Sequence, residues 1–171
     1  MTNKMKSTVA GLLVILATLA VLSACSTRTI LGDLTGEDNG RKLHIWFVKT
    51  AGDQLTLVEV SRQSGRGDSV KQSVEDLLTG PSGQEIQAGL GSEIPRGTIL
   101  LGVEEKAGTI ELNLSRRFAS GGGSSSLETR IEQLRRTVTD SAGSKKVFLN
   151  VEGHRLTSAS GEGLEIKQPI N

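Results

Sequence analysis

The stretch from Thr109 to Ser115 reads TIELNLS, and it shows the arrangement of the fold most directly. Every second residue from Ile110 to Leu114 is apolar and the residues between them are polar, so one face of this strand should be buried and the other should meet water. Residues 99–105, which are rich in aliphatic side chains, precede it across a turn signal at 106–108. The two segments predict an antiparallel sheet that is covered on one side.

Two longer helices are predicted from apolar residues that recur at helical spacing. The first follows Asp68, a suitable N-cap, and ends at Gly80-Pro81, because proline cannot continue the backbone hydrogen bonds. The second follows Ser125, which has capping-box spacing to Glu128, and a short helical turn is expected over residues 83–88. The apolar positions are Val70, Val74, Leu77 and Leu78 in the first helix and Leu127, Ile131, Leu134 and Val138 in the second. Each stripe is expected to pack against the sheet.

Further strands are predicted on both sides of these helices. Residues 43–48 and 55–61 should form a hairpin around a turn at 51–53. Residues 147–151 alternate like the central strand, and a short last strand is expected around 164–166. The order β-β-α-β-β-α-β predicts an α+β fold, a two-layer sandwich with two helices packed on one face of a mixed, mostly antiparallel sheet.

The first 24 residues have the features of a secretory signal peptide. Lys4 and Lys6 precede an apolar run over residues 9–22, which is shorter than the roughly 20 residues of a membrane-spanning helix. The run ends in Leu22-Ser23-Ala24-Cys25, which resembles the bacterial lipobox, and Cys25 is the only cysteine. The resemblance implies that lipid-bearing Cys25 becomes the N-terminus of an exported protein, anchored to a bacterial membrane and facing the periplasm or the cell exterior. An ordinary signal peptide with an unmodified thiol is the alternative.

Composition divides the chain into three segments and excludes one class of partner. Residues 1–24 are the predicted signal peptide, the polar residues 25–40 a flexible tether, and residues 41–171 a single domain. Loss of the two signal-peptide lysines changes the formal net charge from +1 to −1. This balance argues against nucleic-acid binding, which needs a clustered basic surface.

The sequence contains no recognisable catalytic or metal-binding pattern. His44 and His154 lack cysteines or carboxylates at metal-ligand spacing, and no serine lies in a G-x-S-x-G motif. A triad assembled only in space stays open as an alternative. Residues 121–123 are three glycines before a helix, but they lack the Lys-Ser/Thr of a phosphate-binding loop. We therefore expect no enzyme activity, no metal and no cofactor.

Trp46 and Asn113 are the candidates for a binding surface. Asn113 lies in the middle of the central strand and should point away from the core, either simply into water or toward a ligand or partner. Trp46 would support such a surface if its strand lies in register. Thr137, late in the second helix, is expected to have a structural role, bonding back along the helix or bridging to the sheet.

Several short motifs along the chain resemble the GerMN domain, a bacterial envelope module associated with sporulation and spore germination. They are, in order, Leu77–Pro81, Pro95–Thr98, Leu112–Ser115 with Phe118, Leu134–Thr139, and Val147–Val151 with Gly153. The resemblance covers residues 43–153 and implies a fold similar to the ring-building modules of secretion and sporulation channels. The chain carries one such domain, whereas the germination protein has two in tandem. Residues 119–126, ASGGGSSS, form an insert that is expected to be a flexible loop.

Together these features favour a membrane-anchored lipoprotein whose non-catalytic GerMN-like domain binds an envelope protein or a cell-wall component such as peptidoglycan. A cell-wall enzyme or enzyme accessory is one alternative. A structural oligomer of an envelope complex, joined through sheet edges, is another.

Overall fold

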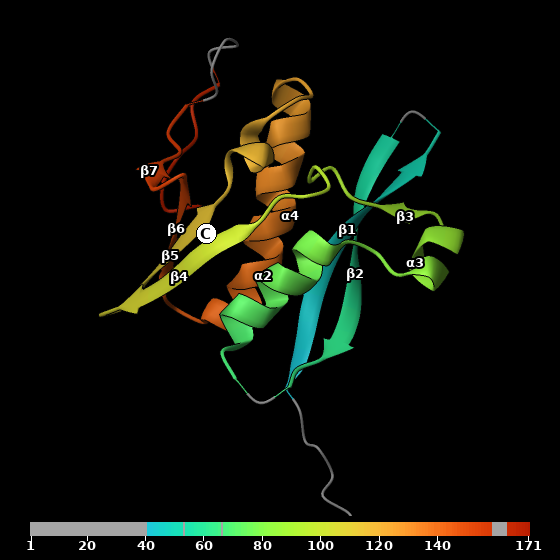
Figure 1. Ribbon diagram of the computed structural model, residues 1–171. Helices are drawn as coiled ribbons and strands as arrows, with labels where there is room; N and C mark the ends of the chain where they lie inside the picture. The colour runs from blue at the N-terminus through green and yellow to red at the C-terminus, as the bar shows by residue number, and fades with distance from the viewer. Residues whose placement is uncertain (1–40, 53, 66, 159–163) are drawn as a thin grey trace, which may run out of the picture. The chain divides into compact units, whose positions relative to one another are not determined.

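The computed structural model describes residues 41–52, 54–65, 67–158 and 164–171 (Figure 1). The predicted signal peptide and tether, and with them Cys25, lie outside the described residues. The described residues belong to one compact unit. No helix within the described part has the length and apolar character that a membrane crossing requires.

The predicted hairpin forms most of the first sheet. Strands β1 (Lys42–Ala51) and β2 (Gln54–Gln63) pair antiparallel along their full length. In β1, Leu43, Ile45 and Phe47 are completely or almost completely buried, whereas the residues between them are half-buried. A short strand, β3 (Leu90–Gly91), pairs with the other side of β1 and gives the order β2-β1-β3.

The second sheet contains the TIELNLS strand. Its order is β4-β5-β6-β7, formed by β4 (Leu100–Lys106), β5 (Thr109–Leu114), β6 (Lys146–Val151) and β7 (His154–Arg155). Only the β5–β6 pair is parallel, because the chain crosses over through a helix between these two strands. The apolar side chains of β5 are fully buried, as the alternation predicted.

The helices follow the predicted stripes closely. Helix α2 (Ser69–Thr79) starts at Asp68, whose carboxylate accepts from two backbone N–H groups, and α3 (Gly83–Gln87) carries the predicted capping box. Helix α4 (Ser124–Ala142) is the longest helix in the described part of the chain, and a turn of 3₁₀ helix, η1 (Arg116–Ala119), precedes it. In Figure 1 α4, in orange, runs between the two sheets, with α2 beside it. The predicted stripe residues of both helices are buried, except for Leu78 and Ile131, which are partly buried.

The α+β class is confirmed, but the strands form two sheets where one was expected. The reason lies at the edge of β1 that faces α4. There the N–H of Trp46 donates to the Thr137 hydroxyl over 3.0 Å, and the Gln133 side chain donates to the Trp46 carbonyl over 3.0 Å. Helix side chains thus satisfy backbone groups that a neighbouring strand would otherwise pair. Thr137 therefore has the sheet-bridging role that was one of its two expected roles.

The Gly-Ser insert differs from the predicted flexible loop because Arg130 of α4 is buried beneath it. All five N–H groups of its guanidinium are satisfied by protein acceptors. They donate over 2.7–3.1 Å to the carbonyl oxygens of Glu93, Phe118, Ser120 and Gly121 and to the hydroxyl of Ser126. Gly122 packs so closely that a Cβ there would meet Arg130 at 2.7 Å. The insert is therefore fixed by hydrogen bonds and close packing.

Two smaller predictions at element ends were wrong or incomplete. Helix α4 has Gly123 as its N-cap, with no side-chain cap, because the chain becomes helical before the predicted capping serine, Ser125. The last strand is reduced to an isolated bridge between Ser158 and Glu165. Next to this bridge, the backbone N–H of Ile166 donates to the carbonyl oxygen of Thr157 over 2.8 Å.

Candidate binding surface

Trp46 lies where β1 meets α4, with its backbone held by the helix as described above. Its side chain is half-buried, and the Arg136 guanidinium lies 4.8 Å from the centre of the indole. The two side chains, with Arg135, Thr139 and Asp140, line a shallow hollow of about 240 Å³. A cation over an aromatic face is a favourable contact that also keeps the ring in place.

Glu132 fixes the two arginines of this hollow. Its carboxylate accepts from Arg135 over 2.6 and 2.7 Å and from Arg136 over 2.7 Å. The hydrogen bond from Arg135, followed by the contribution of Arg136, lowers the pKa of Glu132 to about 2. The hollow therefore presents two guanidinium groups that Glu132 holds in place and whose positive charge it partly neutralises.

The β2 side of Trp46 adds a hydrogen-bonded pair of side chains. Glu59 is the register partner of Trp46, and its carboxylate bonds His44, which precedes Trp46 by two residues on the same face of β1. We name the group of Trp46, His44, Glu59, Arg135 and Arg136 the Trp46 surface. It joins one aromatic ring to polar and charged side chains from three elements.

Asn113, the other candidate, lies in the second sheet and has a partner of its own. Its side-chain oxygen accepts from the N–H of Gly153 over 2.8 Å. This bond supports the turn between β6 and β7, where Glu152 and Gly153 both have positive φ. Asn113 and Trp46 are on strands of separate sheets, so the structure does not bring them together. The observed contact gives Asn113 a structural role, and a binding role stays a prediction.

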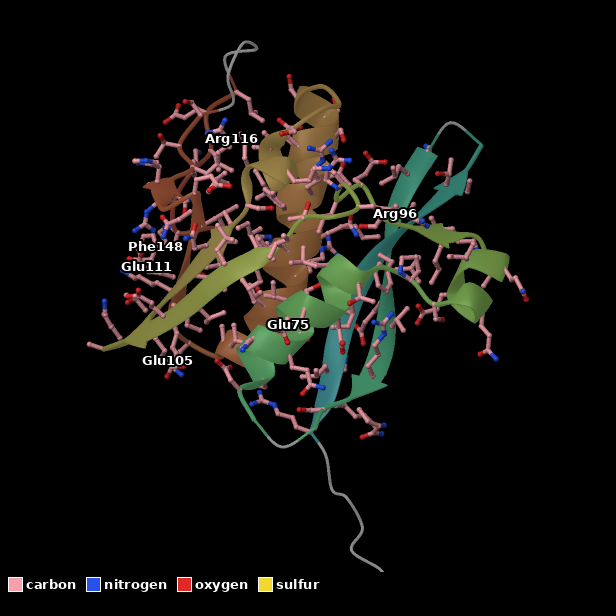
Figure 2. The ribbon with its side chains drawn as sticks, viewed as in Figure 1. Glu75, Arg96, Glu105, Glu111, Arg116 and Phe148 are labelled. Atoms are coloured by element: carbon pink, nitrogen blue, oxygen red, sulfur yellow. The ribbon has the colours of Figure 1, made fainter. Side chains whose placement is uncertain are left out.

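A polar cluster that the sequence analysis missed surrounds Glu111 on the outer face of the second sheet. Glu111 accepts from Asn150 over 2.8 Å and from Arg155 over 3.1 Å, and the Arg155 guanidinium lies 4.2 Å from the centre of the Phe148 ring. Figure 2 shows Glu111 and Phe148 next to each other. The bond from Asn150 is the main cause that lowers the pKa of Glu111. The cluster links three strands, and its only sequence signal is the polar half of the TIELNLS alternation.

The histidines do not form a site in the described residues. His44 is in β1 and His154 is in β7, so they belong to different sheets. No group of three or more histidine, cysteine, aspartate or glutamate side chains lies close enough together there to hold a metal ion. The expected absence of metal, cofactor and catalysis stays a prediction.

Comparisons with known proteins agree on the fold. The family model described as "Germane: Sporulation and spore germination" matches residues 44–157. The first GerMN domain of the sporulation protein GerM from Bacillus subtilis superposes with a TM-score of 0.60 and 21% identity, over 74% of this chain and 94% of that one. The tandem GerMN domains of the same protein superpose with a TM-score of 0.55 and 16% identity, over 74% of this chain and 45% of that one. No curated protein sequence matches the chain.

At these identities the two solved structures establish similarity of fold, and the predicted resemblance to GerMN domains is confirmed. The family model covers well over half of the sequence, from β1 to the end of β7. The chain therefore belongs to the Germane family of sporulation and spore germination proteins.

Proposed function

We propose that this protein is a lipid-anchored envelope protein whose GerMN domain is a binding module without catalytic activity, and that the Trp46 surface contacts its partner. The partner is an envelope protein or a cell-wall component. The observation that carries the proposal is the half-buried indole of Trp46, held by Arg136 and bordered by polar and charged side chains from β1, β2 and α4.

The composition of this surface supports a role in binding. Tryptophan and arginine are the residues most often found at the energetic centres of protein interfaces. Here both are already oriented, Trp46 through its backbone bonds to α4 and Arg136 through Glu132. A pre-oriented side chain loses little conformational freedom on binding, so more of its contact energy contributes to affinity.

The anchoring part of the proposal rests on the lipobox-like sequence before Cys25. Cys25→Ala should move the protein from the membrane fraction to the soluble fraction. Mass spectrometry of the membrane-extracted wild type should find no residue before Cys25. Unchanged membrane association of the variant would contradict the anchor.

Photo-crosslinking in cells tests the binding surface directly. A benzophenone amino acid at position 59 replaces an exposed side chain opposite Trp46 and leaves the indole in place. We expect a discrete adduct from this position and none from the control position Lys71, which is exposed on α2. Sensitivity of the adduct to protease or to muramidase identifies the partner as protein or peptidoglycan. Equal adducts from both positions, or none from position 59, would contradict the assignment.

The purified protein should also release no soluble fragments from isolated cell walls. Release that a single point substitution abolishes would instead support a cell-wall enzyme. A self-adduct from position 59 would support the structural oligomer.

A further inference from the structure

A groove lies between the C-terminal end of α2, helix α3 and the segment that runs from β3 to residue 96. It encloses about 240 Å³. Its aliphatic walls are formed by Leu78, Pro81, Ile86, Leu90 and Ile94. Arg96 is the one charged side chain among the described residues that line it, and Figure 2 shows it on the segment between β3 and β4. The groove thus combines apolar walls with a single positive charge.

The walls are held in place by Arg62 of β2. Its guanidinium donates to the carbonyl oxygen of Gly80 at the end of α2 over 3.1 Å and to the carboxylate of Glu85 in α3 over 2.9 Å. Glu85 in turn accepts from the backbone N–H of Ser82 over 2.6 Å, which closes the capping box of α3. One side chain therefore fixes both helices that border the groove, so the groove exists before any ligand binds.

The apolar wall includes a side chain that the core does not use. Ile86 is 49% exposed, and α3 has no buried residue. The enclosed volume is below the roughly 300–1,000 Å³ of sites that take up a drug-sized molecule. It suits one or two aliphatic side chains of a larger partner.

Arg96 supplies a charge that nothing in the described residues neutralises. Its side chain is exposed and forms no hydrogen bond or ion pair with the described residues. Glu85 of α3 instead pairs with Arg62 over 2.9 Å, and Glu93, on the same segment as Arg96, accepts from the hydroxyl of Ser126 over 2.7 Å. A guanidinium binds a carboxylate through two parallel hydrogen bonds, so a carboxylate from a partner is the complementary group.

The strand beside the groove can add backbone contacts. β3 is the outer strand of its sheet, with one side paired to β1 and the other paired to no strand in the described part of the chain. Extended peptides commonly bind along such an edge, with alternate side chains entering adjacent pockets.

We infer that this groove binds an extended peptide segment of a partner protein, in which an aliphatic side chain stands one or two residues from a carboxylate. The aliphatic side chain enters between Ile86 and Leu90, and the carboxylate pairs with Arg96. The groove shares no residue with the Trp46 surface. This inference therefore goes beyond the proposed function, and each can fail without the other.

Selection from a displayed library of random heptapeptides tests the inference, with the full chain in detergent as the target. We expect enrichment of peptides in which Leu, Ile or Val stands one or two residues from Asp or Glu. The dissociation constant of an enriched peptide should rise about tenfold or more in Arg96→Gln, since hydrogen bonds to charged groups are the strong ones. It should also rise in Ile86→Ser.

Arg116→Gln is the matched control, because Arg116 is exposed and does not line the groove. That variant and Trp46→Ala should bind the peptide as wild type does. The inference is overturned if no peptide is enriched, if the enriched peptides lack the aliphatic–carboxylate pair, or if Arg96→Gln binds normally. Thermal unfolding of each variant checks that it is folded. If Ile86→Ser does not fold, Arg96→Gln alone decides.

Discussion

Arg130 and Arg136 lie on the same helix, less than two turns apart, and have opposite surroundings. Arg130 is 3% exposed and donates all five of its N–H groups to neutral protein acceptors. The Arg136 side chain is 40% exposed, pairs with Glu132 and lies over the ring of Trp46. Arg130 fixes the protein's own backbone, whereas Arg136 shapes a surface that meets solvent.

The comparison separates stability from binding within one helix. A buried guanidinium with every donor satisfied cannot be removed without leaving buried acceptors unpaired. A partly exposed ion pair contributes little to the free energy of unfolding, because water and salt screen it. We therefore expect substitutions at the two arginines to affect different measurements.

The largest effect is expected for Arg130→Ala, which should lower the free energy of unfolding by about 3 kcal/mol or more. Arg130→Lys should recover less than half of this loss, because an ammonium group cannot reach acceptors spread around a planar fork. Urea unfolding measures both. The matched variant Arg136→Ala should lose less than about 1 kcal/mol. Equal losses of unfolding free energy in Arg130→Ala and Arg136→Ala would contradict the separation of a stabilising arginine from a surface arginine.

A smaller effect is expected for Asn113→Ala, which removes the bond to Gly153. The free energy of unfolding should fall by about 1 kcal/mol, the usual contribution of one hydrogen bond. Asn113→Asp keeps an acceptor oxygen and should stay near wild type. The crosslink from position 59 should be unchanged in both. A weaker crosslink in a fully stable Asn113→Ala would extend the binding surface to the second sheet.

The smallest effect is expected in the pH dependence of the free energy of unfolding, through Glu132. The pKa of Glu132 is lowered to about 2 in the folded protein, from an ordinary value of 4.5. The charged form therefore stabilises the fold above about pH 4.5, and this contribution is lost as the pH falls toward 2. Because the pair is about one-third exposed, the difference should be below about 1 kcal/mol. The unfolding free energy of Glu132→Gln should depend less steeply on pH in this range, and an identical slope would show that the pair is not formed in solution.

Local chemistry made much of the fold predictable. The alternation in TIELNLS, the N-cap at Asp68 and the capping box at Ser82 each act over a few residues, and each appears as predicted. The separation into two sheets was not predictable in this way. It depends on Gln133 and Thr137 reaching a strand far away in the sequence.

One feature of the sequence indicates that the Gly-Ser insert is fixed. Arg130 lies three residues after Leu127 and four before Leu134, and so on the same helix face as the apolar stripe. A charged residue at a core position indicates a buried hydrogen-bonding partner, although the sequence does not say which segment supplies the acceptors. The pairing of Trp46 with Arg136 left no comparable signal, since it requires the register of β1 against α4.

The most direct test of the account is to measure the position-59 crosslink and the unfolding free energy together in Trp46→Ala. The indole is half-buried, so its loss should cost about 1–2 kcal/mol and leave the domain folded. We predict that the adduct nevertheless falls at least tenfold. An adduct that persists at wild-type yield in the folded variant would contradict the claim that Trp46 forms the centre of the binding surface.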